Sequence, residues 1–362
     1  MIPGKAEPEK YQSLLDEKIQ MLRQDFANFT LPELKVYPSP ELHFRMRAEF
    51  KIWQKDGVAA YAMYEPGQYK QAILIDEFSI GSKEISLTMH PLMACINEQE
   101  ILRKKLFQIE FLTSTIGEIL VTLIYHKTLE ESWVREATRL QEKLQVSIIG
   151  RSRGQKTILD KDHIIEKFIV SGQTYTYQQV EASFTQPNAR VCEQMLNWAA
   201  ATSSNIGGDL LELYCGNANF TLPLSKNFTK VLATEISKKS VKSALHNIEL
   251  NNINNIEIVR LSSEEFTQAI NKTRPFQRLS HIDLNSYSFT TIFVDPPRAG
   301  LDPGTIALAK RFDNIIYVSC NPQTLKENLQ SLIETHEIKD FALFDQFPYT
   351  EHSECGVYLT RL

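Results

Sequence analysis

The second half of the chain alternates short, mostly apolar runs with segments of helical periodicity. The runs predict seven strands, at residues 209–214, 230–234, 256–261, 290–294, 314–318, 340–344 and 357–360. Apolar runs of this length are typical of strands that are buried on both faces. Because helices fit between the early strands, the pattern predicts a doubly wound parallel sheet. The last two strands are joined by too short a connection for a crossover helix, so the seventh is expected to run antiparallel.

The first half of the chain has a different pattern. Residues 11–27 have apolar side chains at nearly helical spacing and predict an amphipathic helix, which is followed by several prolines. Beyond it, short strand-like runs mix with helices, without βαβ order. The strands are expected at residues 44–53, 58–64, 71–75 and 118–126, and the helices around 91–105 and 132–144.

These patterns divide the chain into three parts. Residues 1–36 hold an N-terminal helix that is expected to pack on the last part. Residues 37–180 form a smaller α+β domain, and residues 181–362 form the α/β domain with the seven-stranded sheet.

Composition narrows the class of protein. The 362 residues are 43% hydrophobic and 23% charged, which is ordinary for a globular chain of two domains. No run approaches the roughly 20 apolar residues of a membrane span, and no signal peptide is expected at the start. Five scattered cysteines without a Cys-x-x-Cys pair favour a reducing cytoplasm and argue against a zinc or iron–sulfur centre. The net charge of −5 predicts no global attraction to nucleic acid, although local patches can still bind it.

Candidate chemistry lies where the late strands end. Cys320 follows the strand at 314–318 within a Ser-Cys-Asn-Pro turn, and Asp295 follows the strand before it within Asp-Pro-Pro-Arg. Glu354 comes just before the last strand. In α/β proteins, functional groups gather beyond the carboxyl ends of the strands. A thiol with a few per cent thiolate at neutral pH is a strong nucleophile, so Cys320 is predicted to attack a polar, planar substrate. The alternative is a buried, inert cysteine.

The turn after the first strand of this sheet is a candidate cofactor loop. Gly216 allows a tight turn before a helix, and Glu235 ends the next strand about 20 residues later, where nucleotide-binding sheets place an acceptor for ribose hydroxyls. The loop has one glycine where a dinucleotide fingerprint has three. A nucleoside without phosphates therefore fits better, and S-adenosylmethionine is the obvious candidate. A purely structural strand–glycine–helix turn is the alternative.

Several motifs together resemble the RNA uracil-5-methyltransferase family. They lie at residues 37–53, 105–109, 183–188, 295–301, 319–322, 344–349 and 354–356, so the similarity spans nearly the whole chain. The resemblance is strongest to the tRNA-modifying branch. Members that modify ribosomal RNA usually carry an additional β-barrel domain or an iron–sulfur cysteine cluster, and neither is visible in this sequence.

The resemblance implies a mechanism as well as a fold. It implies an S-adenosylmethionine-dependent methyltransferase domain, with Cys320 attacking carbon 6 of a uracil and Glu354 removing the proton from carbon 5 after methylation. In the sheet of these methyltransferases the seventh strand lies beside the fifth, which would bring Glu354 close to Cys320. Glu351 and His352 are the rival bases. The implied product is 5-methyluridine (ribothymidine) in the T loop of tRNA.

The same resemblance assigns the cofactor site. The residues expected to bind S-adenosylmethionine are Gln186, Tyr214, Gly216, Asn219, Glu235 and Asp295. Ala218 departs from the family, which usually has glycine there, and is expected to be tolerated if its φ is negative. Asp-Pro-Pro followed by an aromatic residue marks enzymes that methylate exocyclic amines, but Arg298 stands at that position in this chain. No metal and no iron–sulfur cluster are expected.

The smaller domain is expected to bind the RNA. Strand alternation places Arg45, Arg47 and Lys51 on one face of a strand, and Phe107 could stack in a gap left by a displaced base. Arg298 completes the predicted RNA contacts. For each charge a solvated surface position is an alternative, and for Phe107 a core position.

The expected partner is the T arm of tRNA, with no membrane and with the protein as a monomer. Transfer-messenger RNA, which has a T-like arm, is a candidate substrate. Two other functions remain open: the same methylation on ribosomal RNA, and a non-catalytic RNA-binding or RNA-folding role. The second would not require Cys320 and Glu354 together.

Overall fold

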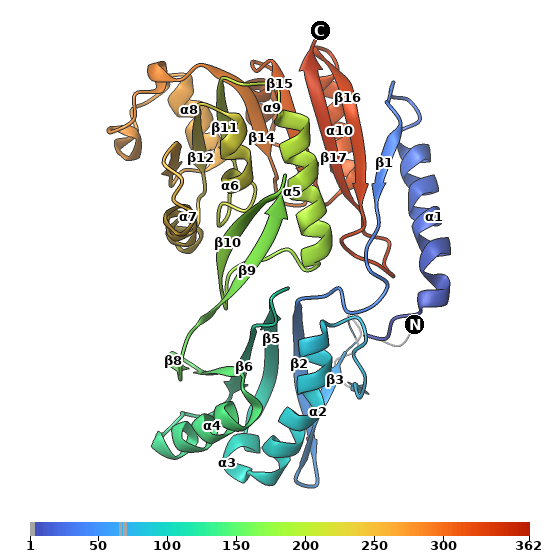
Figure 1. Cartoon of the computed structure of the whole chain (residues 1–362), viewed down its shortest axis with the longest axis vertical. Coiled ribbons are helices and arrows are strands. Elements are labelled where there is room, and N and C mark those ends of the chain that lie inside the picture. Colours follow the sequence, from blue (N-terminus) through green and yellow to red (C-terminus); the bar gives the residue numbers. More distant parts are fainter. Residues whose placement is uncertain (1–3, 65–66, 68–70) are drawn as a thin grey trace. The chain divides into compact units, whose positions relative to one another are not determined.

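The computed structural model describes residues 4–64, 67 and 71–362 and divides the chain into two compact units (Figure 1). The small unit consists of Met1–Glu9, Pro40–Glu166 and Gln178–Ala189. The large unit consists of Lys10–Ser39, Lys167–Tyr177 and Arg190–Leu362. The chain thus passes between the units several times, whereas the predicted divisions fall at residues 36/37 and 180/181. Within the part of the chain that the structure describes, no helix is long and apolar enough to cross a membrane.

The large unit is built on a sheet whose strand order is β1-β16-β17-β15-β14-β11-β12-β13. Its strands are β1 (Leu34–Tyr37), β11 (Asp209–Leu213), β12 (Lys230–Thr234), β13 (Ile256–Val259), β14 (Phe289–Val294), β15 (Asn314–Ser319), β16 (His336–Phe344) and β17 (Glu354–Arg361). All seven predicted strands are present. The last of them, β17, runs antiparallel between β15 and β16, which confirms the predicted direction.

The sheet contains one strand more than the seven predicted. The additional strand, β1, pairs parallel with β16, with Leu34 opposite Phe341 and Tyr37 opposite Phe344. β1 has only four residues and lies between prolines, so its pattern is too short to be recognised as a strand. It forms because the edge of β16 offers free backbone donors and acceptors to any extended neighbour.

Helices cover both faces of this sheet (Figure 1). They are α1 (Pro8–Asp25), α5 (Ala189–Ser203), α6 (Thr221–Leu224), α7 (Lys238–Leu250), α8 (Ser263–Ile270), α9 (Pro303–Ala309) and α10 (Pro322–Leu332). Short 3-10 turns lie at Ser225–Asn227, Gln277–Leu279 and Leu284–Ser286. Apolar residues of α1, α8, α9 and α10 share one core with Leu211, Ile292 and Tyr317 of the central strands. On the opposite face, Trp198 of α5 lies 5.6 Å from Phe344, measured between ring centroids.

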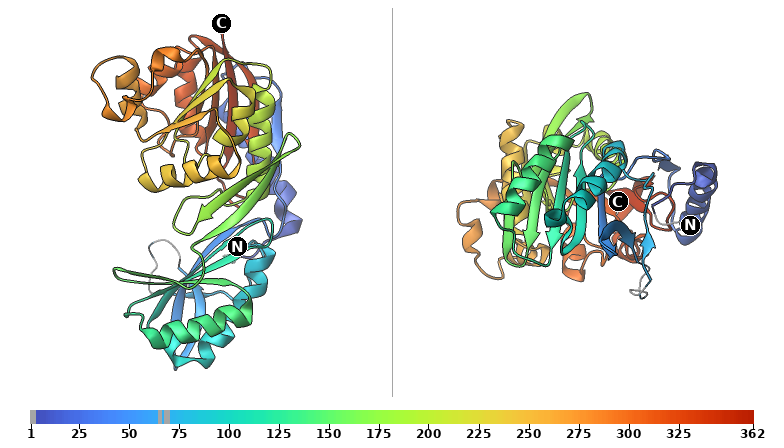
Figure 2. Two further views of the ribbon diagram at one scale, coloured as in Figure 1. Left: turned by 60° about the vertical axis from the view of Figure 1, so that its left-hand side comes forward. Right: turned by 90° about the horizontal axis from the view of Figure 1, so that it is seen from below.

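The small unit contains a seven-stranded sheet with the order β4-β3-β2-β5-β6-β7-β8. Its elements are β2 (Arg47–Lys55), β3 (Val58–Met63), β4 (Ile73–Leu74), α2 (Lys83–Glu98), α3 (Glu100–Arg103), β5 (Leu106–Thr113), β6 (Ile119–Tyr125), α4 (Glu131–Leu144), β7 (Ser147–Ser152) and β8 (Gln155–Ile158). The helices lie on one face of the sheet (Figure 2). Buried residues of α2 and α4, including Leu92 and Trp133, form a core with Phe50, Ile109 and Leu123 of the sheet.

The predicted elements of this unit needed several corrections, and β7 and β8 have no predicted counterpart. The strand β5 was not predicted, although it lies in the middle of the sheet and pairs with β2 and β6. The helix predicted at 91–105 begins earlier, because Ser82 caps α2 and Pro91 lies inside it. Proline removes the hydrogen bond to the carbonyl four residues before it. That carbonyl belongs to Leu87, whose residue is 75% exposed, so water can replace the missing donor.

The strands β9 (His163–Val170) and β10 (Gln173–Val180) form a separate two-stranded sheet that leaves the small unit and returns to it. Its tip belongs to the large unit and is anchored there by side chains. Backbone amides of Ile169 and Ser171 donate to Glu193 and Asn197 of α5. The Tyr177 hydroxyl donates to the carbonyl of Asn219 at 2.9 Å.

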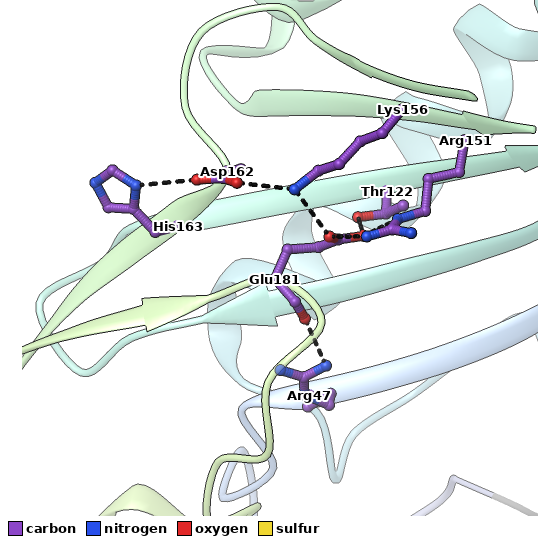
Figure 3. Close-up of polar contacts among 7 residues, drawn as sticks. All are labelled: Arg47, Thr122, Arg151, Lys156, Asp162, His163 and Glu181. Carbon is purple, nitrogen blue, oxygen red and sulfur yellow. Dashed lines mark hydrogen bonds and ion pairs between the residues drawn. The ribbon is translucent and has the colours of Figure 1, made fainter. Parts of the chain in front are cut away.

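A buried ion-pair network ends β10 within the small unit (Figure 3). The Glu181 side chain is 4% exposed, and Arg151 donates to its two carboxylate oxygens at 2.5 Å each. Lys156 lies 3.5 Å from one oxygen, and the Thr122 hydroxyl donates to the other at 3.2 Å. Although burial opposes ionisation, these partners lower the pKa of Glu181 below its ordinary value. The network therefore fixes the point from which residues 182–188 leave the sheet.

Candidate active site

The structure brings Cys320 and Glu354 together where β15 ends and β17 begins, in the interior of the large sheet. In the antiparallel pair of β15 and β17, Ser319 is the partner of Cys355. Because partners in an antiparallel pair step in opposite directions, the next position on each chain sets Cys320 beside Glu354. Glu354 is also held from the other side, where it pairs with Phe344 of β16.

Local hydrogen bonds hold the turn that carries Cys320. The Asn321 side chain caps α10 by accepting from the backbone of Gln323 at 3.1 Å, and Pro322 takes the first helical position. The Asn321 amide also donates to the carbonyl of Arg298 at 3.0 Å. The Ser-Cys-Asn-Pro turn and the Asp-Pro-Pro-Arg turn are therefore joined, and the thiol projects from a fixed loop.

The thiol of Cys320 is more strongly protonated than the sequence suggested. Burial, followed by the charges of Glu354 and Asp295, raises the pKa of Cys320 to about 11, against a weaker opposing effect of Arg298. At that pKa only about one thiol in ten thousand is ionised at pH 7. The expectation of a few per cent thiolate is therefore wrong for the protein without substrate. The physical reason is that a partly buried sulfur between two carboxyl groups is a poor place for another negative charge.

Glu354 and Asp295 form a pair of carboxyl groups with little access to water. Glu354 is 2% exposed, and burial together with the nearby Asp295 raises its pKa far above the ordinary value. Burial also raises the pKa of Asp295. Glu354 is buried and Asp295 is half-buried. Two carboxyl groups in such a place cannot both be ionised cheaply, so the pair retains a proton at neutral pH.

The rival bases lie elsewhere on the same loop. Glu351 and His352 are both exposed. His352 lies with its Nδ1 atom 3.2 Å from a guanidinium nitrogen of Arg298. Burial and the strand register therefore favour Glu354 as the group that faces the thiol. Cys355, next to it, is fully buried, as expected for the head of a strand.

The candidate cofactor loop follows β11. Its backbone has positive φ at Tyr214 and Gly216, and the amide of Gly216 donates to one carboxylate oxygen of Glu235 at 3.0 Å. The other oxygen accepts from the backbone of Ser237 at 2.7 Å. The Tyr214 hydroxyl donates to Ser263 at 2.7 Å. Glu235 is thus oriented beside the glycine, and space is open on the side of Gly216 where a Cβ atom would lie.

Two residues of this loop have environments that the sequence did not reveal. Ala218 has φ +69° and is fully buried, so the condition under which its methyl group was expected to be tolerated, a negative φ, is not met. Glu212, in the middle of β11, is 1% exposed, and burial with a contribution from Asp295 raises its pKa to about 8. Its Oε2 atom has no hydrogen-bond partner among the described residues. An acid flanked by leucines inside a buried strand was the signal that could have identified Glu212.

The polar groups at the carboxyl ends of these strands fit a nucleoside that carries a positive charge and ribose hydroxyls. Carboxyl groups of Glu212, Glu235 and Asp295 belong to three neighbouring strand ends, and the amide side chain of Asn219 follows the glycine turn. Carboxylates accept from hydroxyl and ammonium groups, both of which S-adenosylmethionine has. In the described part of the chain, no cluster of three or more His, Cys, Asp or Glu side chains is arranged to hold a metal ion.

Gln186 belongs to the small unit, on the segment that follows Glu181. Two nitrogens of the Arg47 guanidinium donate to the carbonyls of Glu181 and Ser183, at 2.9 and 2.8 Å. The amide of Met46 donates to the carbonyl of Pro187 at 2.8 Å. Arg47, a predicted RNA contact, is thus already bound to the backbone of the segment that carries Gln186.

The predicted RNA contacts Lys51 and Phe107 lie together on the small unit. Phe107 is 37% exposed, so the core alternative for this residue is excluded. Its ring stacks on His126 with centroids 4.3 Å apart, and the Lys51 amine lies 4.2 Å from the ring centroid. Phe107 and His126 line a surface hollow of about 390 Å³ together with Ile52, Gln54, Lys104, Lys105 and Leu106. His126, at the end of a predicted strand, was not singled out from the sequence.

The alternation predicted for the strand around residues 44–53 is confirmed. Phe44, Met46, Ala48 and Phe50 are buried, and their neighbours face the other way. Arg45 lies just before β2 and uses its Nε atom to donate to the carbonyl of Arg47 at 2.9 Å. Arg298 is exposed at the rim of the Cys320 turn.

The fold and the site define the class of protein. A parallel sheet with β17 inserted antiparallel beside β15, a glycine turn after β11 and an acid after β12 make the large unit an S-adenosylmethionine-dependent methyltransferase domain. The same fold occurs in the tRNA (uracil-54, C5)-methyltransferase of Pyrococcus abyssi, whose crystal structure contains S-adenosyl-L-homocysteine. The similarity covers 97% of this chain and 83% of that one, with a TM-score of 0.73 and 22% identity.

Within that class, the chain belongs to the tRNA (uracil-5-)-methyltransferase family, whose model matches residues 10–362. A relative from Cellvibrio japonicus is 61% identical over 97% of this chain and 96% of its own length. Another from Teredinibacter turnerae is 58% identical over the full length of both chains. Both are named tRNA/tmRNA (uracil-C(5))-methyltransferase. The resemblance derived from the motifs is therefore confirmed.

Proposed function

We propose that the protein transfers a methyl group from S-adenosylmethionine to carbon 5 of the T-loop uridine of tRNA, forming 5-methyluridine. The observation that carries this proposal is the juxtaposition of Cys320 and Glu354 at the facing ends of β15 and β17. The names of the relatives from Cellvibrio japonicus and Teredinibacter turnerae support methylation of uracil carbon 5 in tRNA.

The reaction needs both side chains because carbon 5 of uracil is a weak nucleophile. Cys320 gives up its thiol proton to water as its sulfur adds to carbon 6, which makes the ring an enolate whose carbon 5 can accept a methyl group. S-adenosylmethionine, when bound, supplies that methyl group. Glu354 then takes the proton from carbon 5, the double bond between carbons 5 and 6 re-forms, and the sulfur leaves as a thiolate.

The raised pKa values of Cys320, Glu354 and Asp295 are consistent with this order of chemical steps. Cys320 remains a thiol until the uracil is in place, so an unoccupied site holds little reactive thiolate. The carboxyl pair of Glu354 and Asp295 is held away from water, where a carboxylate binds protons tightly. A base with a raised pKa is suited to remove a proton from carbon.

The cofactor is proposed to lie at the carboxyl ends of β11, β12 and β14. Tyr214, Gly216 and Asn219 come from the first of these turns, and Glu235 and Asp295 from the other two. Gln186 is proposed as a further cofactor residue on the family resemblance.

The small unit is proposed to hold the RNA. A uridine must leave its stack before a thiol can reach its face, and the exposed Phe107–His126 stack offers a surface for the bases left behind. Lys51 beside it supplies positive charge for the RNA backbone, with Arg45 just before the same strand. Arg298 is proposed to contact the target nucleotide at the rim of the Cys320 turn.

The substrate range follows from the same surface. Transfer-messenger RNA has a T-like arm, and both relatives carry it in their names, so it is proposed as a second substrate. The protein is proposed to act as a monomer in the cytoplasm, where its five cysteines would remain reduced.

Unmodified tRNA that contains 5-fluorouridine tests this function. With S-adenosylmethionine, the protein is expected to form an adduct that survives denaturation, because fluorine at carbon 5 cannot be removed as a proton. Cys320→Ala is expected to form none. Methylation of ordinary tRNA without any adduct would contradict the thiol mechanism. Methylation of ribosomal RNA transcripts but not of tRNA would contradict the substrate, and RNA binding without methyl transfer would indicate a non-catalytic role.

A further inference from the structure

Helix α1 places a lysine in an unusual position, deep in the large unit. The Lys18 side chain is 5% exposed, and its amine lies 2.7 Å from Oδ1 of Asp345, which is 1% exposed. The same amine donates to the carbonyl of Phe347 at 2.8 Å. Lys18 thus makes two hydrogen bonds to the connection between β16 and β17, more than 300 positions away in sequence.

This arrangement is not what stability alone would select. Taking both members of an ion pair out of water is costly, and apolar residues of similar volume are often as stabilising or more so. Burial lowers the pKa of Lys18, and the charge of Asp345 opposes this shift. Loss of hydration therefore makes the charged form of Lys18 less favourable. In some proteins a buried ion pair serves to fix one particular geometry.

The geometry imposed here concerns the loop of residues 345–353, which ends at Glu354. Asp345 comes directly after Phe344, the strand partner of Glu354. The amide of Asp345 donates to the carbonyl of Tyr37 in β1 at 3.0 Å. The start of the loop is therefore held by Lys18 on one side and by β1 on the other, next to the residue that pairs with the base.

The later residues of this loop contact both α1 and the surroundings of the Cys320 turn. The ring of Tyr349, at a positive φ of 62°, lies edge-on to Tyr11 of α1 with centroids 6.0 Å apart. Phe347 packs edge-on against His352, which in turn contacts Arg298 beside the Cys320 turn. The α1 contacts thus continue through the loop to the rim of the thiol.

We propose that Lys18 is a positioning residue that sets Glu354 for the removal of the carbon 5 proton. The inference rests on the proposed function and deepens it. In that step the carboxylate of Glu354 gains the proton, the electrons of the C–H bond re-form the double bond between carbons 5 and 6, and the bond from carbon 6 to sulfur breaks, with its electrons leaving on Cys320. Addition of the thiol and methyl transfer precede this step and do not need the base in its final place.

We expect loss of the Lys18 amine to slow one step of the reaction, the removal of the carbon 5 proton. Lys18→Met should still form the adduct with 5-fluorouridine tRNA at a rate within about two-fold of the unchanged protein, because a distant change to the base leaves the thiol in place. Turnover of ordinary tRNA should fall about ten- to a hundred-fold, as expected when a catalytic group is displaced by around an ångström. The methylated adduct with ordinary uridine should then accumulate and survive denaturation.

Four further variants accompany Lys18→Met in this measurement. Glu354→Gln removes the base itself and should accumulate the same methylated adduct. Arg23→Met removes an exposed cation from the last turn of the same helix and should leave turnover unchanged. Lys18→Arg keeps the charge and should restore part of the turnover that Lys18→Met loses. If Lys18→Met does not fold, Asp345→Asn, which keeps the shape of its side chain, is expected to show the same accumulation of adduct.

The outcomes separate the inference from the proposed function. Equal losses in 5-fluorouridine adduct formation and in turnover would overturn the positioning role and make Lys18 a general support of the fold. Unchanged turnover in both Lys18→Met and Asp345→Asn would overturn it as well. If the unchanged protein forms no adduct with 5-fluorouridine tRNA, the proposed function fails first, whatever the variants do.

Discussion

At the residue scale, the surroundings of Cys320 in the fold set the protonation state of its thiol. A free cysteine ordinarily has a small thiolate fraction at neutral pH, and the motif alone suggested such a thiol. Burial between two carboxyl groups holds the proton on the sulfur instead. In the proposed mechanism, the same pair of carboxyl groups supplies the base that later removes a proton from carbon. The site therefore gives up thiol reactivity in the free protein in exchange for a strong base.

Alkylation should reveal this raised pKa. Below a pKa of about 11 the thiolate fraction rises ten-fold per pH unit, so the rate of Cys320 modification by iodoacetamide should rise about ten-fold per unit from pH 7 to pH 10. Peptide mass spectrometry at each pH measures it, with the fully buried Cys355 as an unreactive internal control. A plateau reached near pH 8 would contradict the raised pKa.

Ala218 offers a test of backbone strain in the cofactor loop. Its left-handed φ of 69° costs a residue with a Cβ atom roughly 1–2 kcal/mol, and glycine avoids that cost. Loss of one buried methyl group costs about 0.8 kcal/mol. Ala218→Gly is therefore expected to raise the free energy of unfolding by up to about 1 kcal/mol, seen as a higher urea midpoint. A lower midpoint would mean that methyl packing outweighs the strain.

At the element scale, the strand β2 shows how one alternating pattern serves two purposes. Its buried face, with Ala48 and Phe50, is part of the small-unit core. Its other face was predicted to bind RNA, but Arg47 is held by two backbone carbonyls while Lys51 extends over the ring of Phe107. Positions on one face of a strand thus have different roles, because the neighbours that reach them come from other parts of the chain.

Salt dependence of tRNA binding should separate these two cations. A side chain that contacts a phosphate contributes close to one unit to the slope of log affinity against log salt concentration. Lys51→Ala is therefore expected to lower that slope by about one. Arg47→Ala is expected to leave the slope unchanged, because two backbone carbonyls already accept from its guanidinium. An equal loss of slope in both variants would make Arg47 an RNA contact after all.

At the scale of the whole molecule, the N-terminal helix is part of the large unit although most of the small unit intervenes in the sequence. Tyr11, Leu15, Leu22 and Phe26 of the N-terminal segment belong to the same core as Leu211 and Val294 of the central strands. Phe26 is fully buried, with its ring centroid 5.1 Å from that of Phe341. The methyltransferase domain is therefore assembled from both ends of the chain.

Substitutions in this N-terminal segment should show how far the stability of the large unit depends on it. Phe26→Ala, directly after α1, removes a fully buried ring and is expected to destabilise the large unit by about 3–5 kcal/mol. Met21→Ala, on α1 itself but 53% exposed, should change the unfolding free energy by less than about 0.5 kcal/mol. Urea unfolding followed by circular dichroism measures both. Similar small effects from the two variants would mean that this segment contributes little to the stability of the large unit.

The sequence by itself determined the elements that rely on long, regular patterns and the residues that form compact motifs. The seven apolar runs, the antiparallel direction of the last strand and the motifs around Cys320 and Glu354 could all be recognised locally, because periodicity and turn chemistry act over a few residues. The family followed from those motifs, since they span nearly the whole chain.

Only the tertiary structure decided what depends on distant partners. The four-residue strand β1 exists because the edge of β16 lies beside it, and β5 became a central strand through its neighbours β2 and β6. The high pKa of Cys320, the positive φ of Ala218 and the burial of Lys18 against Asp345 likewise arise from groups brought together by folding. Solvation, charge and backbone geometry at a residue depend on everything that surrounds it in space, and a local pattern does not contain that information.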